Sequence, residues 1–125
     1  MVPDVQEGSL EGGLPCVSFG DGPPLVVFPG LGRSNASPVG FQRWGEVRLL
    51  APFARAFTVY RVGRRIGLGT RTTMAELAND YTRAIEGEFG RAVDVLGIPT
   101  GGFVALQLAA DRPGLLRKLV VAGAA

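Results

Sequence analysis

The stretch VDVLGIPTGGFVALQLAADRP, residues 93–113, carries the pattern that decides the fold. A valine-rich apolar run ends at Gly97, a short turn containing Pro99 follows, and a second apolar segment continues until it stops at Pro113. Short apolar runs bounded by turn residues are typical of buried strands, and a proline commonly marks the end of a helix. The stretch therefore predicts a strand over residues 93–96, a tight corner, and a helix over about residues 101–111.

Four further apolar runs predict strands, because each is bounded by glycine, proline or polar residues. They cover residues 14–19, 25–28, 57–60 and 116–122. Between two of these runs, Trp44, Val47 and Leu50 recur at helical spacing until Pro52 interrupts the pattern.

A second helical segment begins with a capping box formed by Thr73 and Glu76. The apolar positions that follow share one helical face; they are Met74, Leu77, Ala78, Tyr81 and Ile85. Strands that alternate with helices through short connections predict an α/β protein. We expect a three-layer sandwich whose mostly parallel sheet is covered on both faces.

The composition limits the class of protein. The 125 residues suffice for one domain with a real core, and 46% of them are hydrophobic. The net charge is only +2 and the basic residues are scattered, so we expect no nucleic-acid partner. A secretory leader pattern and an apolar run of bilayer-spanning length are both missing. Together with the single cysteine, Cys16, these features predict a cytoplasmic protein without membrane association.

The sequence contains no histidine, which is the usual general base for serine and cysteine nucleophiles and the commonest metal ligand. With one cysteine in addition, we expect no metal site. The glycines around Leu31 could begin a dinucleotide-binding loop, but the third glycine position holds Asn35 and no acidic residue ends a strand at the expected distance. We therefore expect no cofactor.

Four motifs occur in an order and spacing that resemble the N-terminal half of an α/β-hydrolase fold protein. The strand over residues 25–28 and the following Pro-Gly-Leu-Gly resemble a strand with its oxyanion loop. RRIGLG at residues 64–69 resembles the family's Asp-x-Arg-Gly-x-Gly loop with altered spacing. Residues 97–101 match the frame of the Gly-x-Ser-x-Gly elbow, and residues 106–113 resemble the end of the helix that follows it. The resemblance covers about residues 14–125 and implies an incomplete α/β-hydrolase fold, with residues 1–125 as the N-terminal part of the domain.

In that family the elbow serine attacks an acyl carbon, a histidine takes its proton, and an acidic residue orients the histidine. The resemblance places Pro99 at the nucleophile position, between the elbow glycines Gly97 and Gly101. It implies that the backbone N–H groups of Thr100 and Leu31 are the oxyanion donors. The family's acid and histidine come from later strands, and Asp94, inside the strand before the elbow, does not match the acid.

Pro99 removes the serine chemistry that the resemblance would imply. Proline has no hydroxyl group, and its ring holds φ near about −65°, whereas the elbow needs a positive φ. Thr100 is the remaining hydroxyl at the corner and only a weak alternative nucleophile, because no histidine activates it. We therefore expect a protein resembling a serine ester or acyl hydrolase that is inactive as given.

Two alternatives remain open. One is a non-catalytic binding module whose pocket takes a small acyl- or ester-type ligand or a protein partner. The other is one half of a split hydrolase, completed by a second chain or by a homo-oligomer. Around the motifs, Arg64 and Arg65 are expected to be a solvated loop pair rather than an anion site, and Cys16 a small buried core residue.

Overall fold

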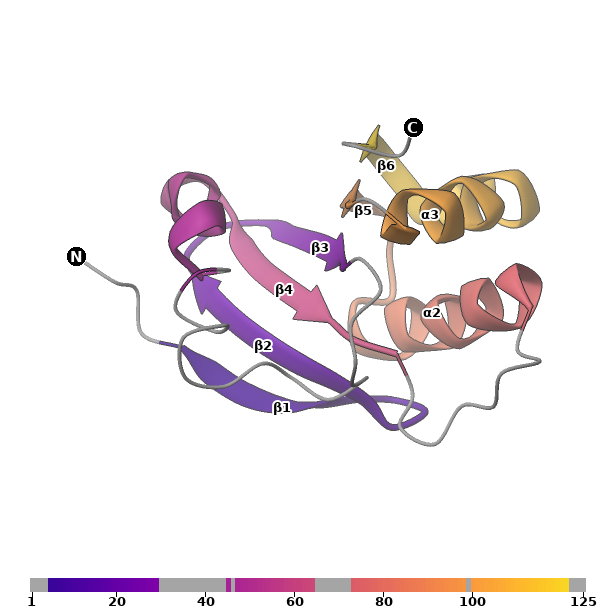
Figure 1. The fold of residues 1–125 in the computed structure, drawn as a ribbon, viewed down its shortest axis with the longest axis horizontal. Coiled ribbons are helices and arrows are strands. Elements are labelled where there is room, and N and C mark those ends of the chain that lie inside the picture. Colours follow the sequence, from indigo (N-terminus) through magenta and orange to yellow (C-terminus); the bar gives the residue numbers. More distant parts are fainter. Residues whose placement is uncertain (1–4, 30–44, 46, 65–72, 99, 122–125) are drawn as a thin grey trace.

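A computed structural model of the chain describes residues 5–29, 45, 47–64, 73–98 and 100–121. Within them a six-stranded sheet has the order β1-β2-β4-β3-β5-β6 (Figure 1). The strands are β1 Gln6–Leu10, β2 Leu14–Gly20, β3 Pro24–Phe28, β4 Thr58–Val62, β5 Val93–Gly97 and β6 Leu116–Val121. The β1–β2 and β2–β4 pairs are antiparallel, and the other three pairs are parallel. The predicted mostly parallel sheet is confirmed.

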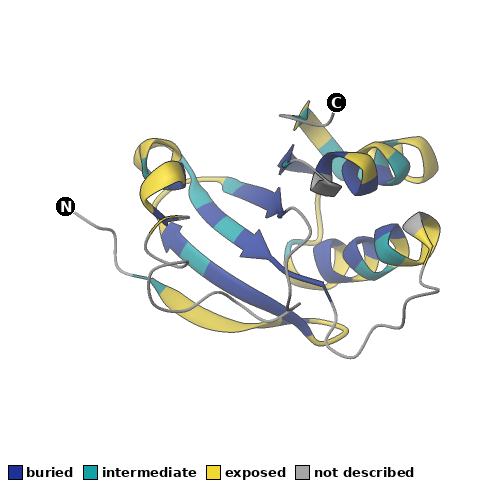
Figure 2. Cartoon of the chain, in the orientation of Figure 1, coloured by how far each residue is buried: buried dark blue, intermediate teal, exposed yellow. Residues whose placement is uncertain are grey.

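Helices cover both faces of this sheet, as a three-layer sandwich requires. On one face, α2 (Met74–Glu88) and α3 (Thr100–Asp111) lie side by side and bury Val26 and Phe28 of β3. On the other face, the 3-10 helix η1 (Ala51–Arg55) and the helical residues before it pack over Leu25 and Val27. Because successive side chains of a strand point to opposite faces, the continuous apolar run of β3 supplies both cores. Figure 2 shows this burial of the central strands.

The start of α2 follows the predicted capping box. Thr73 is the N-cap residue, and its side-chain oxygen accepts a hydrogen bond from the Glu76 backbone N–H at 3.1 Å. Further along α2, Tyr81 is buried, stacks on Phe28 with ring centroids 4.0 Å apart, and donates its hydroxyl hydrogen to the Val62 carbonyl oxygen at 2.9 Å. Tyr81 thereby links α2 to two strands of the sheet.

Two features of the fold differ from the sequence predictions. Strand β1 was not expected, because QEGSL is mostly polar. Its first four residues are exposed at the edge of the sheet, where β1 is held by backbone pairing with β2 and by the buried side chain of Leu10. The sequence of α3 is apolar on nearly every side, a pattern typical of a helix packed within the fold. Its side chains Phe103 and Leu106 are instead 48% and 49% exposed, because the described residues cover only its sheet-facing and α2-facing sides.

A short 3-10 turn, η2 (Pro113–Leu115), connects α3 to β6. Among the strand bounds, β4 begins one residue later than predicted and extends to Val62, and the described part of β6 ends at Val121.

Candidate functional site

The carboxyl ends of β3, β4 and β5 meet at one edge of the sheet, where open α/β sheets bind ligands. Phe28 at the end of β3 is the register partner of Gly97 at the end of β5. The backbone N–H of Ile98 then donates to the Phe28 carbonyl oxygen at 3.0 Å, which extends this pairing beyond the strand. Helix α3 begins at Thr100, three residues after the end of β5. The strand and the helix predicted on either side of the corner are therefore present, with β5 between β3 and β6.

The predicted site residues are only partly within the described residues. Gly97 is buried as the last residue of β5, while Thr100 and Gly101 are the first two residues of α3. Pro99 and Leu31 lie outside the described residues, so the nucleophile position and the two oxyanion donors stay predictions. In the part of the chain that is described, positive φ angles occur only at glycines.

Arg64 corrects the expectation of a solvated arginine pair. Its residue is only 6% exposed, and its Nη2 donates to the Pro29 carbonyl oxygen at 3.4 Å. This contact connects the chain just after β4 to the chain just after β3, at the edge of the sheet where the β5–α3 turn lies. Sequence reasoning missed it because two arginines in a glycine-rich segment are usually exposed. The second arginine, Arg65, lies outside the described residues.

Two buried groups near this end of the sheet, Tyr81 and Cys16, have raised pKa values. Burial raises the pKa of the Tyr81 hydroxyl, although the charges of Arg64 and Arg61 act in the opposite direction. Burial also raises the pKa of the Cys16 thiol to about 12, with a further contribution from Glu88. The thiolate is the reactive form of cysteine, so Cys16 is a core residue, as predicted, rather than a nucleophile.

Asp94 does not belong to this end of the sheet. It is the second residue of β5, close to the amino end of that strand, and its carboxylate pairs with Arg117.

Among the described residues no three His, Cys, Asp or Glu side chains are grouped so that they could hold a metal ion. No helix in the described part of the chain has the length and hydropathy needed to cross a membrane.

No family model and no curated protein matches the sequence, but solved structures match the fold. A hydrolase from Pseudomonas aeruginosa PA01 has 23% identity and a TM-score of 0.67 over 94% of this chain and 45% of its own. An α/β fold family hydrolase from Bacillus anthracis str. Sterne has 22% identity and a TM-score of 0.69 over 97% of this chain and 44% of its own. E-2-(acetamidomethylene)succinate hydrolase has 18% identity and a TM-score of 0.73 over 93% and 43%.

These similarities define the fold. The strand order, the two helices on one face and the superposition on three hydrolase structures show that this chain has the α/β-hydrolase fold. The chain spans less than half the length of these structures, so the fold it forms is incomplete relative to theirs.

Proposed function

We propose that residues 1–125 are the N-terminal part of an α/β-hydrolase domain related to serine ester or acyl hydrolases, and that this part does not form an acyl-enzyme. The observation that carries the proposal is the position of Pro99. It follows the carboxyl end of β5 by two residues and directly precedes the first residue of α3. A nucleophile elbow displays its serine at this position of the fold.

The chemistry of Pro99 excludes a covalent intermediate at that position. Its side chain is a saturated ring without a hydroxyl or thiol, and its nitrogen is part of a peptide bond. Removing the nucleophile from a serine hydrolase leaves roughly 10³–10⁴-fold catalysis over water. The 125 residues also contain no histidine that could activate Thr100.

Hydrolysis of 4-nitrophenyl acetate tests this proposal. We expect the purified chain to release nitrophenolate without an initial burst, at a rate that Thr100→Val leaves unchanged. A stoichiometric burst followed by turnover, abolished by Thr100→Val, would show that Thr100 is a nucleophile and would refute the proposal. Thr73→Val is a matched control, because it changes the same residue type at the start of the other helix on this face.

Ligand binding without catalysis is a second candidate role. The hydrogen bond from Arg64 to Pro29 and the backbone bond from Ile98 to Phe28 hold the ends of three parallel strands together. A fixed strand edge of this kind supports a pocket for a small acyl- or ester-type ligand. Saturable shifts of the Ile98 amide resonance on titration with ethyl butyrate are expected, and strictly linear shifts would count against this role.

A further inference from the structure

A cavity of about 320 Å³ lies at the opposite end of the parallel strands, away from the β5–α3 turn. Its size is near the lower limit for small-molecule sites. The lining residues come from the start of β3, the start of β5 and the start of β6; they are Pro23, Pro24, Arg91, Ala92, Val93, Asp94 and Arg117. The walls thus combine short apolar side chains with two arginines and one aspartate.

The Asp94 carboxylate is the fixed point of this cavity. Its side chain is 6% exposed, and each of its oxygens accepts a hydrogen bond from Arg117, from Nε at 2.9 Å and from Nη2 at 2.7 Å. The pairing of β5 with β6 has an irregularity at this place, because Val93 pairs with Leu116 but Asp94 pairs with Lys118. Arg117 is therefore the extra residue of a bulge, a feature that re-aims a side chain.

The ion pair uses only one edge of the Arg117 guanidinium. Nε and one hydrogen of Nη2 face the carboxylate, and an arginine carries three further N–H groups on its remaining edge. The Arg117 side chain is 56% exposed although its position is fixed by two charge-assisted hydrogen bonds. A guanidinium held in this way presents a preorganised fork to a second anion.

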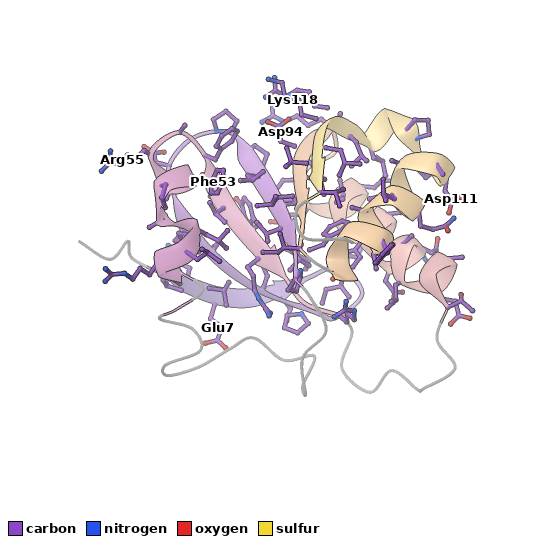
Figure 3. All side chains as sticks on the ribbon, turned by 45° about the horizontal axis from the view of Figure 1, so that its top comes forward. Glu7, Phe53, Arg55, Asp94, Asp111 and Lys118 are labelled. Carbon is purple, nitrogen blue, oxygen red and sulfur yellow. The ribbon has the colours of Figure 1, made fainter. Side chains whose placement is uncertain are left out.

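The charges around the cavity favour such an anion. Arg91 lines the cavity, is exposed, and has no hydrogen-bond or ion-pair partner among the described residues. Lys118 is the register partner of Asp94, and the two labels lie together in Figure 3, far from Glu7. The cavity lining itself therefore contains two arginines and one carboxylate, and Arg117 already neutralises that carboxylate.

We propose that this cavity binds a small organic carboxylate with a compact apolar body. The carboxylate accepts hydrogen bonds from the outer edge of Arg117 and from Arg91, and the apolar body packs on Pro23, Pro24 and Ala92. A neutral ligand would gain no charge-assisted hydrogen bond from either arginine. The site is independent of the function proposed for the carboxyl end of the sheet.

Titration of the ¹⁵N-labelled chain with benzoate tests this site, with the uncharged isostere benzamide as the matched ligand. We expect saturable shifts of the Ala92 and Val93 amide resonances, with a Kd on the order of 1 mM for benzoate, and no saturation with benzamide. Arg91→Gln should weaken benzoate binding about tenfold, the effect of losing one charge-assisted contact. The control Arg112→Gln removes an exposed arginine outside the cavity and should leave the Kd unchanged.

Two results would overturn the assignment. The first is equal response to benzoate and benzamide, which would show that charge is not recognised. The second is an unchanged benzoate Kd in Arg91→Gln. Because Arg91 is exposed, this variant should stay folded even if Arg117→Gln does not, so its amide spectrum reports on the site itself.

Discussion

Asp94 is a charged residue inside an apolar strand, and its environment explains why the sheet tolerates it. Burial of a carboxylate is unfavourable unless hydrogen bonds and an opposite charge compensate for the lost water. Both oxygens of Asp94 are satisfied by Arg117, which reaches it from the bulge in β6. The residue thus contributes to the pairing of β5 with β6 as well as to the proposed anion site.

Replacement of Arg117 by alanine is expected to lower the free energy of unfolding by more than the loss of an exposed ion pair does, because it leaves a buried carboxylate without its donors. The chain contains a matched control. The Arg112–Glu86 pair is 3.1 Å long, but its side chains are 53% and 47% exposed, so Arg112→Ala should cost at most about 0.5 kcal/mol. Urea unfolding measures both values. Equal losses in the two variants would show that burial of Asp94 does not matter to stability.

Cys16 gives a prediction that depends on pH. Its pKa rises from 9.0 to about 12 on folding, mainly because burial disfavours the thiolate. The contribution of Cys16 to the free energy of unfolding is therefore fully present below pH 9. It decreases as the pH rises toward 12, by at most about 1.4 kcal/mol per pH unit.

Ellman's reagent gives a direct check of the same burial. At pH 8 we expect no reaction of the native chain and one thiol per chain in urea, with Cys16→Ser as the blank. Rapid modification of the native chain would contradict a buried thiol.

At the scale of the elements, the N-cap of α2 can be predicted from the sequence alone, because it is formed by two residues three positions apart. Thr73→Ala should destabilise the chain by about 1 kcal/mol, since the Glu76 N–H loses its side-chain acceptor. Thr73→Ser keeps the acceptor and should stay close to the parent. Thermal unfolding followed by circular dichroism compares the three proteins. An unchanged midpoint for Thr73→Ala would show that the cap does not contribute to stability.

The elements that could be predicted are those whose residues encode them locally. The runs that form β3 and β5 are apolar because both faces of these strands are buried, and this pattern is visible without a structure. Strand β1 could not be found in this way, because its polar residues are held by backbone pairing to β2. The burial of Arg64 could not be predicted for a related reason, because it depends on a contact with Pro29, 35 residues away in the sequence.

At the scale of the whole molecule, the described residues leave apolar side chains exposed on both faces of the sheet near its edge strand β6. Phe103 and Leu106 lie on the outer side of α3, and Val120 of β6 is 58% exposed. Exposed apolar groups and an unpaired strand edge promote association.

The double variant Phe103→Glu, Leu106→Lys is expected to keep the parent's stability within about 0.5 kcal/mol, because surface substitutions rarely exceed that. It should also sediment closer to a monomer than the parent does at the same concentration. A matched control, Val104→Glu, places a charge in the core and should unfold the chain. If the double variant unfolded as the control does, α3 would be packed on its outer side as well.

The overall fold followed from the alternation of strands and helices together with the spacing of four short motifs. The candidate site did not follow to the same extent. Gly97 ends β5 and Thr100 begins α3. The elbow between them and the roles of Pro99, Leu31 and the Thr100 N–H stay predictions, because they depend on backbone geometry at residues 31 and 99, outside the described residues. A frame of glycines fixes where a turn occurs, but the chemistry of the site depends on single side chains within it.

The most direct test of the central claim is intact-mass spectrometry of the chain after incubation with a fluorophosphonate, which labels activated serine and threonine nucleophiles. We predict an unchanged mass for the parent, because Pro99 offers no hydroxyl at the end of β5 and no histidine activates Thr100. Stoichiometric addition of one probe per chain, lost in Thr100→Val, would contradict the account and show that an active nucleophile remains at this turn.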